Sequence, residues 1–244
     1  MPRSNRPMFR LLRRLVSWFG VRLLRAETIV ARASLPRFAT PAMGLEIQFP
    51  RNIEAPERIY LGSDVKLGPN CVLRAKTSYP GSWLRHPDGE HVAMSFDPEL
   101  HIGDRVTATA ALGITVFDRV TIEDDVTFAK NVFIADGTHA STRGDVPYKY
   151  QGIDSIAPVR IGQGSWIGNN VVIMPGVTIG AYAIIGANSV VTRDVPAGCI
   201  AVGAPARIVS RWDSTHERWL PPDEATAVLT GGDAQTTASE RTHD

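Results

Sequence analysis

The fold is decided by residues 161–202, which read IGQGSW IGNNVV IMPGVT IGAYAI IGANSV VTRDVP AGCIAV when split into groups of six. The first residue of each hexad is aliphatic in all seven, and the second is glycine in five. A period of six matches neither the 3.6-residue turn of a helix nor the two-residue alternation of a plain strand. It is typical of short strands joined by tight corners and wound into a solenoid.

The chemistry of the hexad predicts which positions face inward. We expect the first residue to point into the solenoid and to stack on its copy one turn away. The fifth residue, always small or β-branched, is expected to face the crowded interior near the next corner. The second residue is placed at the corner, where glycine removes the Cβ clash of an unusual backbone conformation. No hexad buries its apolar face alone, so stacked coils form the core together.

The repeat also runs upstream, less regularly. It begins with LGSDVK and LGPNCV at 61–72, resumes with IGDRVT at 102–107, and returns with IEDDVT, FAKNVF and IADGTH at 122–139. Between the last two stretches, Val116 lies two residues out of register. Two polar stretches, 74–101 and 140–158, interrupt the pattern. We expect both to be loops that leave the coil, and loops of this length are uncommon unless functional.

Composition excludes several classes of protein. The chain has 244 residues, 43% of them hydrophobic, which is enough for one good core. A net charge of +1 argues against a nucleic-acid partner. No apolar run approaches the ~20 residues of a membrane span. Cys71 and Cys199 lie in separate parts of the repeat, so a reducing compartment, the cytoplasm, is expected rather than a disulfide framework.

Residues 1–40 form a separate basic segment with nine arginines and one acid, Glu27. Between residues 8 and 25, apolar side chains fall at helical spacing, with arginines elsewhere around the wheel. Two interpretations stay open: this helix lies on an anionic membrane surface, at the inner membrane face, or it caps the open end of the solenoid. The solenoid domain is predicted to span 41–211, and residues 212–244 to form a disordered tail.

The most specific motifs are GSWIGNNVVIMPGVTIG at 164–180, NSVVTRDVP at 188–196 and GAPAR at 203–207. On these motifs the chain resembles the hexapeptide-repeat acyltransferases, similar to the galactoside, maltose and colanic-acid O-acetyltransferases. The resemblance covers roughly residues 58–211. It implies a left-handed parallel β-helix, a homotrimer with active sites between subunits, and acetyl-CoA or another acyl-CoA as co-substrate. The left hand runs against the usual right-handed crossover and rests on the resemblance.

His139 ends the hexad IADGTH, directly before the 140–158 loop. The resemblance implies that a histidine at this place is the general base. A sugar hydroxyl is a poor nucleophile at neutral pH, and an imidazole can take its proton as it attacks a thioester. Asp136 is a second catalytic candidate, which either orients the imidazole or forms an Asx turn.

A metal site is not expected. His86, His91 and His101 lie in or beside the 74–101 insertion, where three histidines could suggest zinc. Metal-dependent proteins of the same fold carry their histidines on the coil in a recurring spacing, which these three lack.

The resemblance also implies an acyl-CoA groove along the last coils. Asn169 and Ala187, one coil apart, match positions that contact the pantetheine arm. Thr192 and Arg193 match a Thr-Lys pair near the pantetheine and the phosphates. Arg207 matches an arginine beside the adenosine phosphate, a group that guanidinium binds in bidentate fashion. For each of these, a coil position chosen for corner geometry or solubility is the simpler alternative.

The acceptor side departs from the galactoside type. That type carries an acceptor-binding asparagine upstream of the histidine, and the matching position here is Thr109. The 74–101 insertion, with Tyr79 and Trp83, is a candidate for a different acceptor pocket, since aromatic rings stack on sugar faces. Trp166 takes the outward last position of its hexad, where it either contacts a ligand or partner subunit or covers the flank of the coil.

The sequence therefore predicts an acyl-CoA-dependent O-acyltransferase, most simply an O-acetyltransferase, that acts on a saccharide or a glycolipid-linked glycan. Two alternatives stay open. One is an amino-sugar N-acetyltransferase, and the other is a non-catalytic trimerisation scaffold. A scaffold has no reason to keep His139 together with Arg193 and Arg207, which favours the enzyme.

Overall fold

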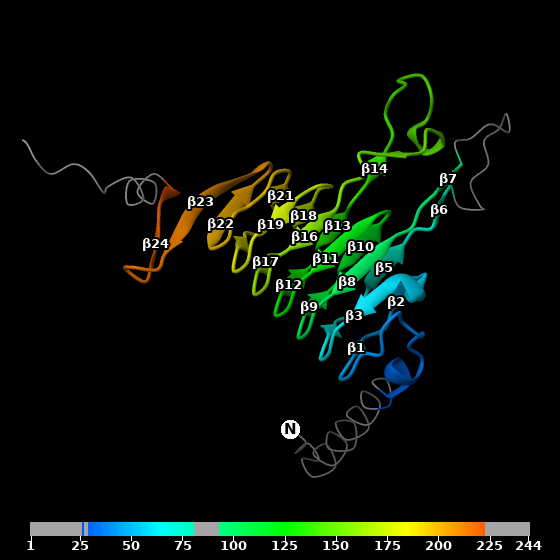
Figure 1. Cartoon of the computed structure of the whole chain (residues 1–244), viewed down its shortest axis with the longest axis horizontal. Coiled ribbons are helices and arrows are strands. Elements are labelled where there is room, and N and C mark those ends of the chain that lie inside the picture. The colour runs from blue at the N-terminus through cyan, green and yellow to red at the C-terminus, as the bar shows by residue number, and fades with distance from the viewer. Residues whose placement is uncertain (1–25, 27–28, 81–92, 223–244) are drawn as a thin grey trace, which may run out of the picture.

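The computed structural model describes residues 26, 29–80 and 93–222 and shows a three-sided solenoid (Figure 1). Each turn adds one short strand to each of three sheets, which we call A, B and C in the order in which the chain visits them. Within the coils all neighbouring strands are parallel. The predicted helix at 8–25 and the chain beyond 222 lie outside the described residues.

The strands follow the sheets in a fixed order. Sheet A holds β1 (Glu46–Ile47), β4 (Lys66–Leu67), β9 (Thr107–Ala110), β12 (Thr127–Lys130), β17 (Trp166–Ile167), β20 (Ile184–Ile185), β22 (Cys199–Gly203), β23 (Ala206–Asp213) and β24 (Arg218–Leu220). Sheet B holds β2 (Arg51–Glu54), β5 (Cys71–Ala75), β10 (Gly113–Val116), β13 (Phe133–Ala135), β18 (Val172–Ile173) and β21 (Val190–Val191). Sheet C holds β3 (Ile59–Leu61), β8 (Glu99–Ile102), β11 (Arg119–Ile122), β16 (Val159–Ile161) and β19 (Thr178–Ile179).

Among the described residues, four further strands and two short 3-10 helices lie outside the coils. The strands are β6 (Ser78–Tyr79), β7 (Met94–Ser95), β14 (Thr138–His139) and β15 (Ile153–Asp154), in two antiparallel pairs. The 3-10 helices are η1 (Pro56–Arg58) and η2 (Tyr148–Tyr150). In the part of the chain that the structure describes, no helix is long and apolar enough to cross a membrane.

The core is a stack of aliphatic side chains inside the three sheets. Along sheet A, Ala108, Phe128, Ile167 and Ile185 pair strand by strand, and all four are buried. The first-position residues from Ile161 to Val191, and the fifth-position residues from Ser165 to Ser189, are likewise buried. These are the inward positions that the hexad predicts.

Glycine is needed at the second position of the hexad, but not for the predicted reason of an unusual backbone conformation at the corner. The left-handed corner residues are those at the fourth position: Gly164, Asn170, Gly176, Tyr182 and Asn188. The glycines at the second position are required for a different reason, the close approach of the next coil. A Cβ on Gly162 would lie 2.5 Å from the backbone nitrogen of Ala181, and one on Gly168 would lie 2.7 Å from that of Ala187.

The length of a coil changes along the solenoid. Stacked residues lie 18 positions apart at Ile167 and Ile185, but 20 apart at Ile114 and Ile134. The longer coils explain why Val116 falls two residues out of the hexad register. At the other end, Ala201 stacks on Ile185, a step of only 16.

This last, shorter coil contradicts the register of the seventh predicted hexad. Ala197, its predicted first residue, is exposed. Val195 stacks on Ile179 instead, and Cys199 fills the interior two residues before Ala201. The inward positions therefore move by two residues after Val191.

Ordered structure continues beyond residue 211, where the solenoid domain was predicted to end. Strand β22 turns back into β23, and β23 pairs with β24, both antiparallel. The rings of Trp212 and Trp219 pack edge to face with centroids 5.5 Å apart. Residues 212–220 are thus part of a hairpin that covers the last coil and not part of a tail, because this pairing satisfies the backbone of the final strand.

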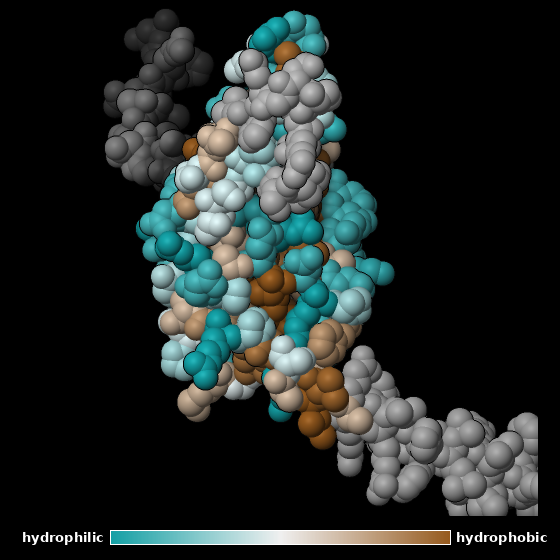
Figure 2. All heavy atoms as spheres, turned by 90° about the vertical axis from the view of Figure 1, so that its right-hand side faces the viewer, coloured by the Kyte–Doolittle hydropathy of each residue, from teal (hydrophilic) through white to brown (hydrophobic). Residues whose placement is uncertain are grey.

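The amino-terminal end of the solenoid is covered by residues that precede the predicted start at 41. A helical segment over 29–33 buries Ala31, and Leu35 and Phe38 pack against the core. Arg51 donates to the carbonyl oxygens of Ala31 and Ile47. Figure 2 shows hydrophobic atoms at the lower end of the face that it presents, the end at which the first strands lie.

Candidate active site at the sheet B to sheet C corner

Two excursions leave the solenoid at the same corner, where the chain passes from sheet B to sheet C (Figure 1). The first, between β5 and β8, contains β6 and β7, and the second, between β13 and β16, contains β14 and β15. Strands β5 and β13 both flank β10, so the excursions start two coils apart. They touch, since the backbone N–H of Ile153 donates to Sδ of Met94 over 3.2 Å.

The excursions differ from the predicted loops in their bounds. The coil runs to Ala75 before the first excursion and resumes at Glu99 after it, so the departure is shorter than 74–101. The second excursion begins with β14, earlier than residue 140. Both excursions contain strands, because the two segments that leave and return pair with each other.

His139 lies at the base of the second excursion. The backbone of His139 on β14 pairs with that of Ile153 on β15, and the side chain of His139 is exposed. The ring nitrogen Nδ1 lies 3.3 Å from the hydroxyl oxygen of Tyr79, and the two rings meet edge to face with centroids 5.5 Å apart. Tyr79 comes from β6 in the first excursion, so the contact joins the two excursions at the imidazole.

An apolar pocket of about 350 Å³ opens beside His139. Its lining residues are Thr115, Phe117, Phe133, Ala135, Gly137, Thr138, His139, Ile153, Ile173, Met174 and Pro175. Four of them lie on three neighbouring strands of sheet B, and three more lie on β14 and β15 of the second excursion. The pocket can therefore hold an apolar group next to a base.

Asp136 does not contact the imidazole. Its carboxylate is fully buried, and its two oxygens accept the backbone N–H groups of Phe117 (2.7 Å) and Asp118 (2.8 Å). Burial raises the pKa of Asp136, and these backbone donors oppose the rise. Asp136 therefore does not have the predicted role of orienting His139. Instead, its carboxylate fixes the turn of the neighbouring coil that carries Phe117, and Phe117 lines the pocket.

Replacing Asp136 by alanine is expected to destabilise the fold by about 1–3 kcal/mol, since it leaves buried backbone donors without an acceptor. Urea denaturation followed by circular dichroism measures the change. Asp145→Ala, at an exposed carboxylate that forms an ion pair with Arg143 two residues earlier, is the control and should leave the midpoint nearly unchanged. Equal midpoints for the two variants would contradict a structural role for Asp136.

His101, rather than His139, is the histidine on a coil strand. It lies on β8, stacks on Tyr60 with ring centroids 4.4 Å apart, and has Nε2 3.1 Å from Glu99. The part of the chain described by the structure holds no group of three or more His, Cys, Asp or Glu that could bind a metal ion. His86, His91 and Trp83 lie outside that part.

The predicted acyl-CoA residues are divided between two corners of one chain. Asn169 and Ala187 are exposed at the corner after β17 and β20, between sheets A and B. Asn169 also has a structural partner, because its Oδ1 accepts the backbone N–H of Lys130 at 2.9 Å. Thr192 and Arg193 are exposed after β21, at the corner that carries His139 two coils earlier. Within one chain the structure does not bring these two sets together.

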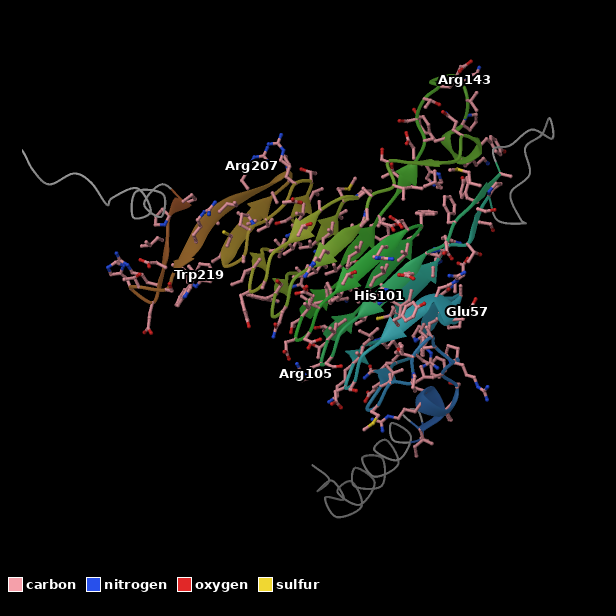
Figure 3. The ribbon with its side chains drawn as sticks, in the orientation of Figure 1. Glu57, His101, Arg105, Arg143, Arg207 and Trp219 are labelled. Atoms are coloured by element: carbon pink, nitrogen blue, oxygen red, sulfur yellow. The ribbon has the colours of Figure 1, made fainter. Side chains whose placement is uncertain are left out.

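Trp166 and Arg207 lie on sheet A. Trp166, on β17, is 52% exposed between Thr127 and Ile184 of the adjacent strands, as its outward position predicts. Arg207, on β23, is exposed, and its guanidinium donates to the carbonyl oxygen of the preceding residue, Ala206. Figure 3 shows Arg207 projecting from the same side of the solenoid as the second excursion, whose tip is marked by Arg143.

Comparison with known proteins agrees with this architecture. The family described as bacterial transferase hexapeptide (six repeats) matches residues 158–193. The chain therefore carries the hexapeptide repeat of bacterial transferases over these residues. Its coil is a left-handed parallel β-helix, as the motifs imply.

The chain is similar to proteins from several bacteria. A galactoside O-acetyltransferase of Escherichia coli K12 is 37% identical over 52% of this chain and 60% of its own length. A maltose O-acetyltransferase structure from Clostridium difficile 630 is 36% identical over 47% of this chain and 60% of its own, with a TM-score of 0.43. The Bacillus cereus N-acyltransferase AntD, solved with dTDP and 3-hydroxybutyryl-CoA, is 17% identical over 80% of this chain and 91% of its own, with a TM-score of 0.56. The last likeness concerns the fold alone.

The galactoside and maltose relatives are named as acetyltransferases, and this chain spans about 60% of the length of each. The sequence predicts His139 as a candidate base beside a loop, and its catalytic role stays a prediction. Tyr79 is predicted only as an aromatic residue of the insertion, because nothing in a separation of 60 residues signals a contact with His139.

Proposed function

We propose that this chain is an acyltransferase that transfers an acyl group from acyl-CoA to a hydroxyl group of a saccharide or of a glycolipid-linked glycan. The observation that carries the proposal is the exposed imidazole of His139 at the edge of an apolar pocket. His139 is the base that takes the proton of the hydroxyl as its oxygen attacks the thioester carbonyl. The pocket supplies an apolar seat for the acyl group beside that reaction.

The spacing along the solenoid supports acyl-CoA as donor. Strand β23, which carries Arg207, lies four strand steps from β12 along sheet A, about 19 Å at about 4.8 Å per step. His139 follows β12 within the same coil. An extended CoA molecule spans such a distance, so its thioester can lie at His139 while its phosphates lie near Arg207.

The division of the candidate residues between two corners favours a homotrimer. One acyl-CoA can contact both Asn169 and Arg193 only if the A–B corner of one subunit faces the B–C corner of the next. The outward face of sheet B offers an apolar surface for this contact, including Phe133, which is 46% exposed. Light scattering during gel filtration tests the proposal, and a monomeric mass with full activity would contradict it.

The experiment that tests the function is an assay of free-thiol release from acetyl-CoA against oligosaccharides and glycolipid extracts. Acceptor-dependent release supports the transferase. Transfer to amino sugars alone would favour the N-acetyltransferase alternative. Absence of acetyl-CoA binding in calorimetry would favour the scaffold.

Arg207→Ala is expected to raise the KM for acyl-CoA about tenfold, as for the loss of one charge-assisted hydrogen bond, with little change in kcat. Initial-rate kinetics at varied acyl-CoA measures this. Arg211→Ala, on the same strand, is the control and should leave the KM near that of the wild type. A fall in kcat at unchanged KM would remove Arg207 from the donor site.

A further inference from the structure

The hydroxyl group of Tyr79 forms a hydrogen bond with Nδ1 of His139. Among the described residues, no hydrogen-bond partner is found for the other ring nitrogen, Nε2. The hydroxyl group of Tyr79 also donates to the backbone carbonyl oxygen of Lys149, in the second excursion. A phenol has a single hydrogen to donate, and the carbonyl oxygen takes it. Toward His139, the hydroxyl oxygen can therefore only accept, so Nδ1 of the imidazole must carry a hydrogen.

This assignment decides the state of the other nitrogen. A neutral imidazole carries one hydrogen, so protonation at Nδ1 leaves the lone pair on Nε2. A lone pair is what a general base requires. We propose that Tyr79 is the positioning residue that fixes His139 in the Nδ1-protonated tautomer and so keeps Nε2 ready to accept a proton. The inference rests on the proposed function of His139 as a base.

A closed ring of contacts holds Tyr79 in place. Tyr79 pairs with Met94 across β6 and β7, and Sδ of Met94 accepts the backbone N–H of Ile153. Ile153 pairs with His139 across β14 and β15, and the ring of His139 contacts Tyr79, which closes the ring. Each excursion therefore fixes the other, and the geometry at the imidazole exists before any substrate binds, which is the arrangement that catalysis favours.

The contact strengthens during the reaction. The acceptor hydroxyl gives its proton to Nε2 while its oxygen bonds to the thioester carbon, and the ring becomes an imidazolium. Nδ1–H is then a charged donor to the oxygen of Tyr79, and hydrogen bonds from charged donors are roughly twice as strong as neutral ones. When the carbon–sulfur bond breaks, Nε2 returns the proton to the departing thiolate. Tyr79 exchanges no proton and touches no reacting atom.

The test compares the full-length wild type with Tyr79→Phe, which keeps the ring and removes the hydroxyl group. Two-bond ¹H–¹⁵N correlation spectra report the tautomer of His139, with the signals assigned by their loss in His139→Ala. We expect Nδ1–H in the wild type and a shift toward Nε2–H in Tyr79→Phe. We expect kcat to fall about tenfold or more with the KM for acyl-CoA nearly unchanged. Tyr60→Phe, which removes a hydroxyl group beside His101 on the coil, should change neither readout.

The possible failures are distinguishable. An Nε2–H tautomer in an active wild type, or an unchanged kcat in Tyr79→Phe, overturns the role of Tyr79 and leaves the acyltransferase standing. An Nδ1–H tautomer in a chain that transfers no acyl group to any acceptor overturns the proposed function, and with it the catalytic meaning of the tautomer. A lower melting temperature in Tyr79→Phe with no change of tautomer would show that the hydroxyl group only stabilises the loops.

Discussion

His139→Ala is expected to lower kcat for acyl transfer by about 10²–10⁴-fold, the usual contribution of a general base. The acyl-CoA dissociation constant and the melting temperature should stay close to those of the wild type. The reason lies in its position: the side chain of His139 is exposed at the base of an excursion, so its removal opens no cavity in the stacked core. Steady-state kinetics, calorimetric titration with acyl-CoA and thermal denaturation measure the three quantities.

The matched control is His101→Ala. His101 is a partly exposed histidine on β8, the coil strand that follows the first excursion, where it stacks on Tyr60 and pairs with Glu99. Its loss should leave kcat within about twofold of the wild type, as for a surface residue outside the site. Equal loss of activity in both variants, or a large loss of stability in His139→Ala, would remove His139 from the role of base.

The sequence predicted the solenoid because its period is a direct record of stacking. Each inward position has to fit a copy of itself one turn away, so the aliphatic first position and the small fifth position repeat without any need to know the distant partners. The corner was harder to predict. Asn170, Tyr182 and Asn188 adopt positive φ without being glycine, so the glycines drew attention to the wrong position.

The change in register after Val191 could not be predicted for a related reason. VTRDVP AGCIAV satisfies the hexad pattern as written. The backbone nevertheless shortens the last coil and stacks Val195 on Ile179. A six-residue pattern allows two registers, two residues apart, wherever apolar residues stand at the inward positions of both. Only the pairing of the strands shows which register the chain adopts.

The site was predictable only where it follows the coil. His139 stands at the end of a hexad, and a motif fixes its place. Its partner Tyr79 depends on how two excursions dock, which no periodicity encodes. For Asp136, closeness in sequence was misleading. It lies three residues before His139, which suggested a catalytic contact, but its carboxylate accepts the backbone N–H groups of Phe117 and Asp118 in the neighbouring coil.

Phe128→Ala is expected to lower the free energy of unfolding by about 3–5 kcal/mol, the cost of removing a fully buried phenyl ring. Phe128 is wholly buried in β12, between Ala108 on β9 and Ile167 on β17. Ladder hydrogen bonds on both sides fix the spacing of these coils, so the walls cannot close around the cavity. Urea denaturation measures the loss. Phe133→Ala, at a half-exposed ring on the next strand, should cost clearly less.

Ala108 stacks directly on Phe128 from the neighbouring coil. Its methyl group is smaller than the side chains of Leu67 and Phe128, its stacked neighbours, and we infer that the ring of Phe128 occupies the room that it leaves. Ala108→Leu alone should overpack the site by about 1–3 kcal/mol, whereas Ala108→Leu combined with Phe128→Leu restores much of the volume. The double variant should therefore lose less stability than the sum of the two single variants, because side chains in contact are coupled. Strict additivity would mean that the two side chains share no space and that the coils stack in another register.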